Sequence, residues 1–172
     1  GTLRVGNGAT SGRLGTGTVV NNGILAFART DLVVVPGVIS GTGSVTSAGG
    51  SVALTGANTY SGGTTLNTGT LVIGNTAAAG TGTITQSSGS SLLKFDTTGT
   101  ISNNMSIYNV ASNQTMTLSG SITAQNTTYD VASGTTLSIN GTISGSGGVT
   151  KNGTGTLTLN GNNTFTGNTT IN

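Results

Sequence analysis

The chain has 172 residues, among them 36 Thr, 31 Gly, 19 Ser and 18 Asn, with charged residues at 5% and a formal net charge of +2. Cys, His, Trp and Glu are absent, which excludes disulfides and metal sites built on Cys or His. Long α-helices are almost excluded as well, because Gly, Thr, Ser and Asn are poor helix formers. Hydrophobic residues still reach 33%, so the composition favours stacked β-structure over disorder.

Pairs of apolar residues separated by one position, typical of one face of a short strand, recur along the whole chain. Their mean step is about 22 positions in the numbering, which is typical of a solenoid coil. This spacing predicts that each pair stacks on the next pair in the following coil, although Val33/Val35 and Val19 compete for places in the series. In chain order, the pairs are Leu3/Val5, Leu25/Phe27, Val52/Leu54, Leu71/Ile73, Leu93/Phe95, Met116/Leu118, Leu137/Ile139 and Leu157/Leu159.

A longer unit repeats as well. The phrase at residues 54–67 returns at residues 159–172, at an offset of 105, and residues 39–46 return at 143–150, at an offset of 104. Residues 1–7 match residues 69–75. The sequence opens and closes within a repeat, so we expect it to be a segment of a longer repetitive protein.

These periods predict an all-β fold, a parallel β-helix of about eight coils of roughly 20–22 residues, formed by residues 1–172 as a single segment. Gly and Asn suit sharp corners, and β-branched Thr suits the outer strand faces. A β-sandwich also has short strands, but it does not explain near-identical phrases at constant offsets. Residues 102–130, where the long repeat expands, form either additional coils or a projecting loop; additional coils with inward aromatics are favoured.

The phrase at residues 54–71, with residues 39–45 as its lead-in, resembles the autotransporter-associated β-strand repeat, also called the passenger-associated transport repeat. A second copy ends at Asn172, and it has Asn168 where the first copy has Gly63. The resemblance implies a right-handed β-helical passenger of an adhesin-type autotransporter. It also implies a location outside the cell or at the cell surface of a Gram-negative bacterium.

The sequence contains few residues of the types that carry out catalysis. Without His, Cys or Glu there is no Ser-His-Asp or Cys-His arrangement. Asp31 and Asp96 follow strands that look equivalent, about three coils or roughly 14 Å apart, which is too far for paired-carboxylate hydrolysis. Asp130 is expected in a loop. We therefore expect no catalytic, cofactor or metal site, and the Asp residues are interpreted as solvated turn residues.

Binding motifs are equally weak. The five cations are scattered and only six aromatic residues accompany them, which disfavours nucleic acid as a partner. No apolar run approaches the ~20 residues of a membrane span. Gly-rich strings lack the pattern of a phosphate-binding loop, and Thr-x-Thr pairs are too irregular for an ice-binding face. The cations are Arg4, Arg13, Arg29, Lys94 and Lys151.

The sequence therefore favours a non-enzymatic stalk or scaffold segment that aids secretion and presentation. Its partners are neighbouring coils of the same parent chain, with end-to-end self-association through unpaired coil ends. Two alternatives remain open. One is an adhesive module that contacts a host or neighbouring-cell surface through one face of the β-helix or through residues 102–130, and the other is a subunit of an extracellular β-solenoid filament.

Overall fold

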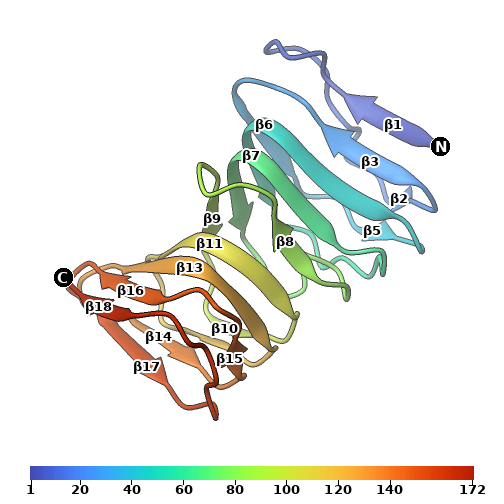
Figure 1. Cartoon of the computed structure of the whole chain (residues 1–172). Helices are drawn as coiled ribbons and strands as arrows, with labels where there is room; N and C mark the ends of the chain where they lie inside the picture. The colour runs from blue at the N-terminus through green and yellow to red at the C-terminus, as the bar shows by residue number, and fades with distance from the viewer.

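The computed structural model describes residues 1–172 and contains eighteen β-strands and no helix. Strand pairs are parallel throughout, and each strand pairs with a strand about one coil away in sequence. The chain therefore winds as a parallel β-helix with its two termini at opposite ends (Figure 1). Both the all-β class and the expected number of about eight coils are confirmed.

Three faces surround the core. The first face contains β1 (Thr2–Val5), β3 (Ile24–Phe27), β8 (Ile84–Gln86), β15 (Ile143–Ser144) and the first halves of β6 (Ser44–Leu54), β7 (Thr64–Ile73), β11 (Met105–Ser112) and β13 (Ile122–Val131). The second face contains β4 (Leu32–Val35), β9 (Leu92–Phe95), β16 (Val149–Asn152), β18 (Thr169–Ile171) and the second halves of those four long strands. The third face contains β2 (Val19–Val20), β5 (Ile39–Ser40), β10 (Gly99–Ile101), β12 (Met116–Leu118), β14 (Thr136–Ile139) and β17 (Thr156–Leu159).

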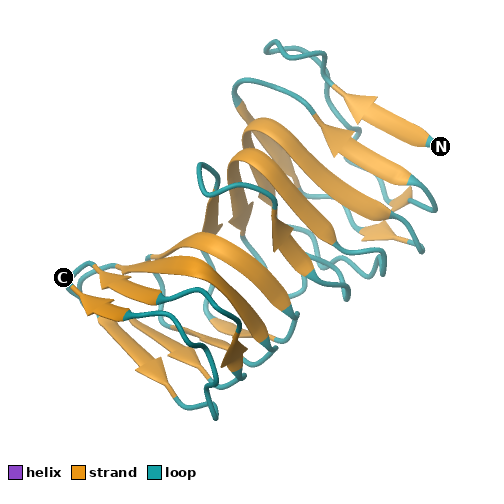
Figure 2. Cartoon of the chain, viewed as in Figure 1, coloured by secondary structure: helices purple, strands orange, loops and turns teal.

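Four long strands turn the corner between the first and second faces without a loop (Figure 2). The corner in β7 uses Gly69 at φ +80°, where an added Cβ would lie 2.0 Å from the Gly50 carbonyl oxygen. In β13 the corner residue is Asn126 at φ 60°, the one non-Gly residue with positive φ. Asn tolerates this left-handed conformation better than other side chains do, and its Oδ1 accepts a hydrogen bond from Gly148 N at 2.9 Å.

The core consists of inward side chains stacked coil upon coil. Of the aromatic residues, Phe27, Phe95, Tyr60 and Tyr129 are fully buried in it. Lys151 breaks the apolar series near the C-terminal end, and its Nζ donates to the carbonyls of Asn152 and Gly153 at 2.7 and 2.8 Å. The ladder of the second face runs through Val33, Val52, Leu71, Leu93, Val110, Tyr129, Lys151 and Ile171.

The apolar pairs predicted to form one series lie on three different faces. Stacking is confirmed within each face, for example between Leu118 and Ile139, both fully buried. The predicted step from Leu25/Phe27 to Val52/Leu54 is wrong, because Leu25 pairs with Val45, and Val52 pairs with Val33, the competing candidate. The step from Leu93/Phe95 to Met116/Leu118 is wrong for the same reason, since Leu93 pairs with Val110 and Leu118 pairs with Ile101.

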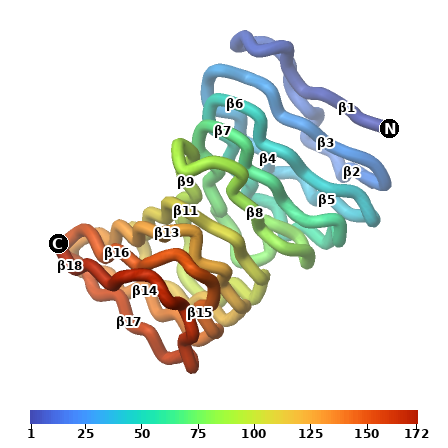
Figure 3. The backbone as a smooth tube through the Cα atoms, viewed as in Figure 1, coloured from blue at the N-terminus to red at the C-terminus, as the bar shows by residue number.

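Residues 102–130 form regular coils, as favoured. They contain β11, β12 and most of β13, and Met105, Met116 and Tyr129 all point into the core. The expectation that Asp130 lies in a loop is wrong, because it is the exposed penultimate residue of β13, paired with Ala111. No loop of this region projects from the rod, as the tube in Figure 3 also shows.

The first coil differs from the others on the second face. Residues 6–18, between β1 and β2, form an irregular arch where a strand of the second face would be expected (Figure 2). Consequently β4 pairs with β6 on one side and with no strand on the other.

Candidate functional site

The three carboxylates lie in different coils and do not converge. Asp31 immediately precedes β4, whereas Asp96 immediately follows β9. The two residues therefore lie at opposite ends of second-face strands and are not equivalent, which corrects the expected match between them. No group of three or more Asp, Glu, His or Cys side chains is placed to hold a metal ion.

Asp130 shares an outward ladder with a cation. Lys94 pairs with Ala111, and Ala111 pairs with Asp130, so the Cα atoms of Lys94 and Asp130 are two strand spacings, or roughly 10 Å, apart. A hollow of about 210 Å³ lies between them over Ala111 and Ala132. The two charges make no ion pair with each other, since the single ion pair of the structure joins Arg29 and Asp31.

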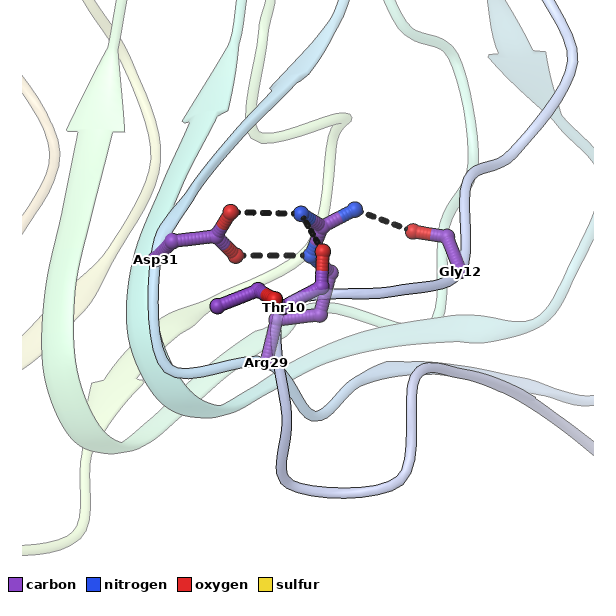
Figure 4. Close-up of polar contacts among 4 residues, drawn as sticks. All are labelled: Thr10, Gly12, Arg29 and Asp31. Atoms are coloured by element: carbon purple, nitrogen blue, oxygen red, sulfur yellow. Dashed lines mark hydrogen bonds and ion pairs between the residues drawn. The ribbon is translucent and has the colours of Figure 1, made fainter.

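The side chain of Arg29, which is 5% exposed, makes four hydrogen bonds (Figure 4). Its Nε donates to Asp31 Oδ1 at 2.8 Å, and its Nη2 donates to Asp31 Oδ2 at 2.6 Å. Nη2 and Nη1 also donate to the carbonyl oxygens of Thr10 and Gly12 in the arch. This planar fork satisfies several acceptors at once, so Arg29 tethers the arch to the second coil.

The contact between Arg29 and Asp31 also shifts the pKa values of both residues. The hydrogen bonds from Arg29 lower the pKa of Asp31 below its usual value, and the nearby positive charge of Arg13 acts in the same direction. The hydrogen bonds to Asp31 correspondingly raise the pKa of Arg29. Both groups are therefore charged at neutral pH. The lowered pKa makes the Asp31 carboxylate a weak base, and the raised pKa of Arg29 keeps its guanidinium from releasing a proton near pH 7.

Two tyrosines are buried and unsuited to surface chemistry. Burial raises the pKa of Tyr60 to about 12, partly offset by its hydrogen bond of 2.5 Å to Thr64 Oγ1. Since the Thr64 hydroxyl donates to the Ala79 carbonyl at 3.0 Å, Tyr60 is the donor in the first bond. Burial also raises the pKa of Tyr129, whose hydroxyl has no hydrogen-bond partner.

An inward Asn recurs at the same place in both copies of the long repeat. Asn58 Oδ1 accepts from Ile39 N at 2.7 Å, and its Nδ2 donates to the Ala78 carbonyl at 2.6 Å. In the second copy Asn163 Oδ1 accepts from Ile143 N at 2.8 Å. The side chain therefore joins its coil to the preceding one in both copies, and in the first copy it also joins the following one.

The two copies of the repeat occupy different faces. In the first copy Leu54 ends a strand of the second face, whereas its counterpart Leu159 ends a strand of the third face. Later in the unit, Leu66 lies on the first face and its counterpart Ile171 on the second. The repeated phrase therefore specifies one turn of local structure and not a position around the helix axis.

Two larger hollows also lie on the surface. One of about 510 Å³ lies at the N-terminal end, beside Leu3, Val19 and Ile24. The other, of about 350 Å³, lies between the arch and β4. Neither contains a carboxylate, so neither provides the acid and base needed for hydrolysis or proton transfer.

Sequence reasoning missed the residues that organise these sites. Arg29 and Asp31 appear in the sequence as two scattered charges, and their separation by two positions was the available signal. The signal for Asn58 and Asn163 was their identity in both copies of the repeat, at the offset of 105. The polar groups make binding contacts and the coils stack, but no site on the chain brings a nucleophile, an acid and a base together.

Comparison with known proteins supports the repeat assignment. Residues 49–73 and 149–172 match the family described as passenger-associated-transport-repeat, so the chain carries two such repeats and the resemblance is confirmed. A stretch of 46 residues is 50% identical to an adhesin from Brucella suis biovar 1 (strain 1330), described as Adhesin BmaC autotransporter. That stretch covers 27% of this chain and 1% of the relative. No solved structure matches the chain.

No segment of the chain forms a helix with the length and apolar character needed to cross a bilayer.

Proposed function

We propose that this chain is a non-enzymatic scaffold segment in the passenger of an adhesin-type autotransporter, displayed outside the cell or at the surface of a Gram-negative bacterium. The observation that carries the proposal is the pair of passenger-associated transport repeats built into one continuous β-helix. The similarity to an adhesin autotransporter supports the same assignment.

The scaffold role follows from how a β-helix stores its stability. Each coil contacts only its neighbours, so the free energy of folding is a sum of local terms. A chain that emerges gradually adds one coil at a time, and each coil presents backbone groups and inward side chains to the next. Folding of this kind provides free energy for secretion without a nucleotide, and the resulting rod holds other parts of the protein away from the cell.

The adhesive alternative receives less support from residues 102–130. Tyr129, Met105 and Met116 are buried in the core, and Tyr108 is half-buried, so this region presents little of the exposed aromatic surface that an adhesive loop would require.

The filament alternative relies on end-to-end contacts. Leu3 and Ile171 are 55% and 79% exposed at the two ends, although Leu25 and Tyr129, which lie in the same two ladders, are buried. The end coils therefore present apolar side chains that inner coils cover. End-to-end association of the isolated chain is part of the proposal.

The proposal is tested by two deletions in the parent protein. Removing residues 45–63 takes out one coil in phase, because Val45 pairs with Thr64 and Leu54 pairs with Ile73, which is the same offset at both places. Removing residues 41–67 takes out more than one coil but less than two, and it therefore shifts the following strands out of phase. Surface display and adhesion per displayed molecule are measured for both.

A scaffold predicts near-normal display for the in-phase deletion and reduced display for the out-of-phase deletion, with adhesion per displayed molecule unchanged in both. Normal display with adhesion abolished in the in-phase deletion would overturn the proposal in favour of a binding module.

A further inference from the structure

The arch and β4 enclose a slot that no part of the chain fills. Contacts at both ends support the arch, and Leu14 of the arch packs against the core. Arg29 bonds the carbonyls of Thr10 and Gly12 at one end, and at the other Gly17 lies so close to Gly37 that a Cβ on Gly37 would be 2.6 Å from its carbonyl oxygen. Between these supports the hollow of about 350 Å³ separates the arch from β4. The arch and β4, which form the two walls of the slot, both belong to this chain.

The inner wall of the slot is an unprotected sheet edge. β4 has the sequence Leu-Val-Val-Val, with no charge and no Pro to discourage pairing. The carbonyls of Asp31 and Val35 accept bonds from Ser51 N and Thr55 N on the β6 side. Because backbone groups alternate in direction along a strand, Leu32 and Val34 direct their N–H and C=O groups into the slot, where no strand pairs with them.

The same two residues also present apolar side chains. Leu32 and Val34 are 56% and 55% exposed, whereas most other outward positions in the chain carry Thr, Ser or Asn. Val34 continues into an outward apolar row through Ala53 and Val72. Exposed aliphatic side chains beside unpaired backbone groups are the two features by which a sheet edge accepts an added strand.

The size and charge of the slot define what fits it. β4 is four residues long, so its edge spans about 13 Å, and the slot is the depth of one coil. It is bounded by the arch, which excludes the edge of a second β-helix but admits a single extended chain. Arg13 lines the slot, is exposed and makes no ion pair, and Asp31, the nearest acid, is already bound by Arg29. An acidic side chain is therefore the complement of the free cation.

We propose that the slot between residues 13–16 and β4 is a docking site for an extended, partly apolar peptide segment of another protein. The segment pairs with the backbone of Leu32 and Val34 and places an acidic side chain beside Arg13. This interaction surface is independent of the scaffold role, because it requires neither secretion nor the repeats.

Hydrogen exchange measured by NMR on the 172-residue chain is the first test. Without peptide, the amides of Leu32 and Val34 should exchange fast, while that of Val33, which pairs with Val52, should be protected. The probe is a synthetic hexapeptide of alternating valine and threonine with one terminal glutamate. Its addition should slow exchange at Leu32 and Val34. Protection of these amides in the free chain would overturn the proposal, because the arch itself would then close the edge.

Variants test the location and the charge preference. Val34→Pro removes an N–H that has no partner in the free chain and is tolerated at an edge, and it should weaken peptide binding at least tenfold in fluorescence anisotropy. Arg13→Glu changes an exposed residue and should weaken binding of the glutamate peptide at least tenfold while restoring binding of a lysine peptide. Val72→Lys, on the same outer face two coils away, is the matched control and should change binding less than twofold.

Failure to bind at millimolar peptide, or binding unaffected by both Val34→Pro and Arg13→Glu, would overturn the proposal. Display of the parent protein is measured in parallel, and loss of peptide binding by Arg13→Glu should leave display unchanged.

Discussion

Replacing the inward Asn of the repeat provides the sharpest test of how the coils are joined. Asn58 is 2% exposed and bonds two buried backbone groups, the Ile39 N–H and the Ala78 carbonyl. In Asn58→Leu both groups lose their partners, at about 1–3 kcal/mol each, and the added apolar burial returns about 1–2 kcal/mol. From the middle of these ranges, the expected net loss is about 2–3 kcal/mol in the free energy of unfolding.

The second copy of the repeat supplies the matched control. Asn163 is half-buried and bonds one backbone group, Ile143 N, so Asn163→Leu should lower the free energy of unfolding by about 1 kcal/mol or less. Urea denaturation measures both variants, and hydrogen exchange at Ile39 and Ile143 locates the effect. Equal losses in the two variants, or a loss below about 0.5 kcal/mol for Asn58→Leu, the scale of surface substitutions, would refute the reasoning.

Three further predictions concern the core. Leu118→Asp should lower the free energy of unfolding by several kcal/mol, because it buries an unpaired charge between stacked coils; urea denaturation showing a loss under about 0.5 kcal/mol would contradict the register. Gln86→Leu should cost about 2–4 kcal/mol in urea, because Gln86 Oε1 accepts from the backbone N–H groups of Tyr108 and Asn109; an unchanged midpoint would contradict this. Burial raises the pKa of Tyr60 to about 12, against about 10 in the unfolded chain. The protonated Tyr60 therefore contributes about 3 kcal/mol to the free energy of unfolding below pH 10, and this contribution is lost as the pH rises from about 10 to about 12. Tyr60→Phe, the residue type of the second copy, should flatten this alkaline decline in urea denaturation.

Much of the fold was predictable because its signal is local. An apolar–x–apolar pair marks a strand wherever it lies, and the near-regular recurrence of such pairs indicates coils. The repeat copies were visible at an offset of 105, and the absence of His, Cys and Glu excluded the commonest catalytic arrangements by composition alone.

The face on which each strand lies was not predictable. Strands on all three faces alternate inward apolar residues with outward polar ones, so the sequence of a strand does not show which face it belongs to. Leu25 and Val52 belong to different faces, although both open an apolar pair. The repeat copies add to the ambiguity, because the same phrase begins on the second face at Leu54 and on the third at Leu159.

The organisation of the polar residues was decided at the tertiary level as well. Arg29 is buried because the arch folds back over it, and the backbone groups of Leu32 and Val34 are unpaired because the arch replaces a strand beside them. A sequence pattern specifies which side chains alternate along a strand, through backbone geometry within a few positions. Which strand lies beside which depends on contacts between successive coils, and those contacts exist only once the chain has wound.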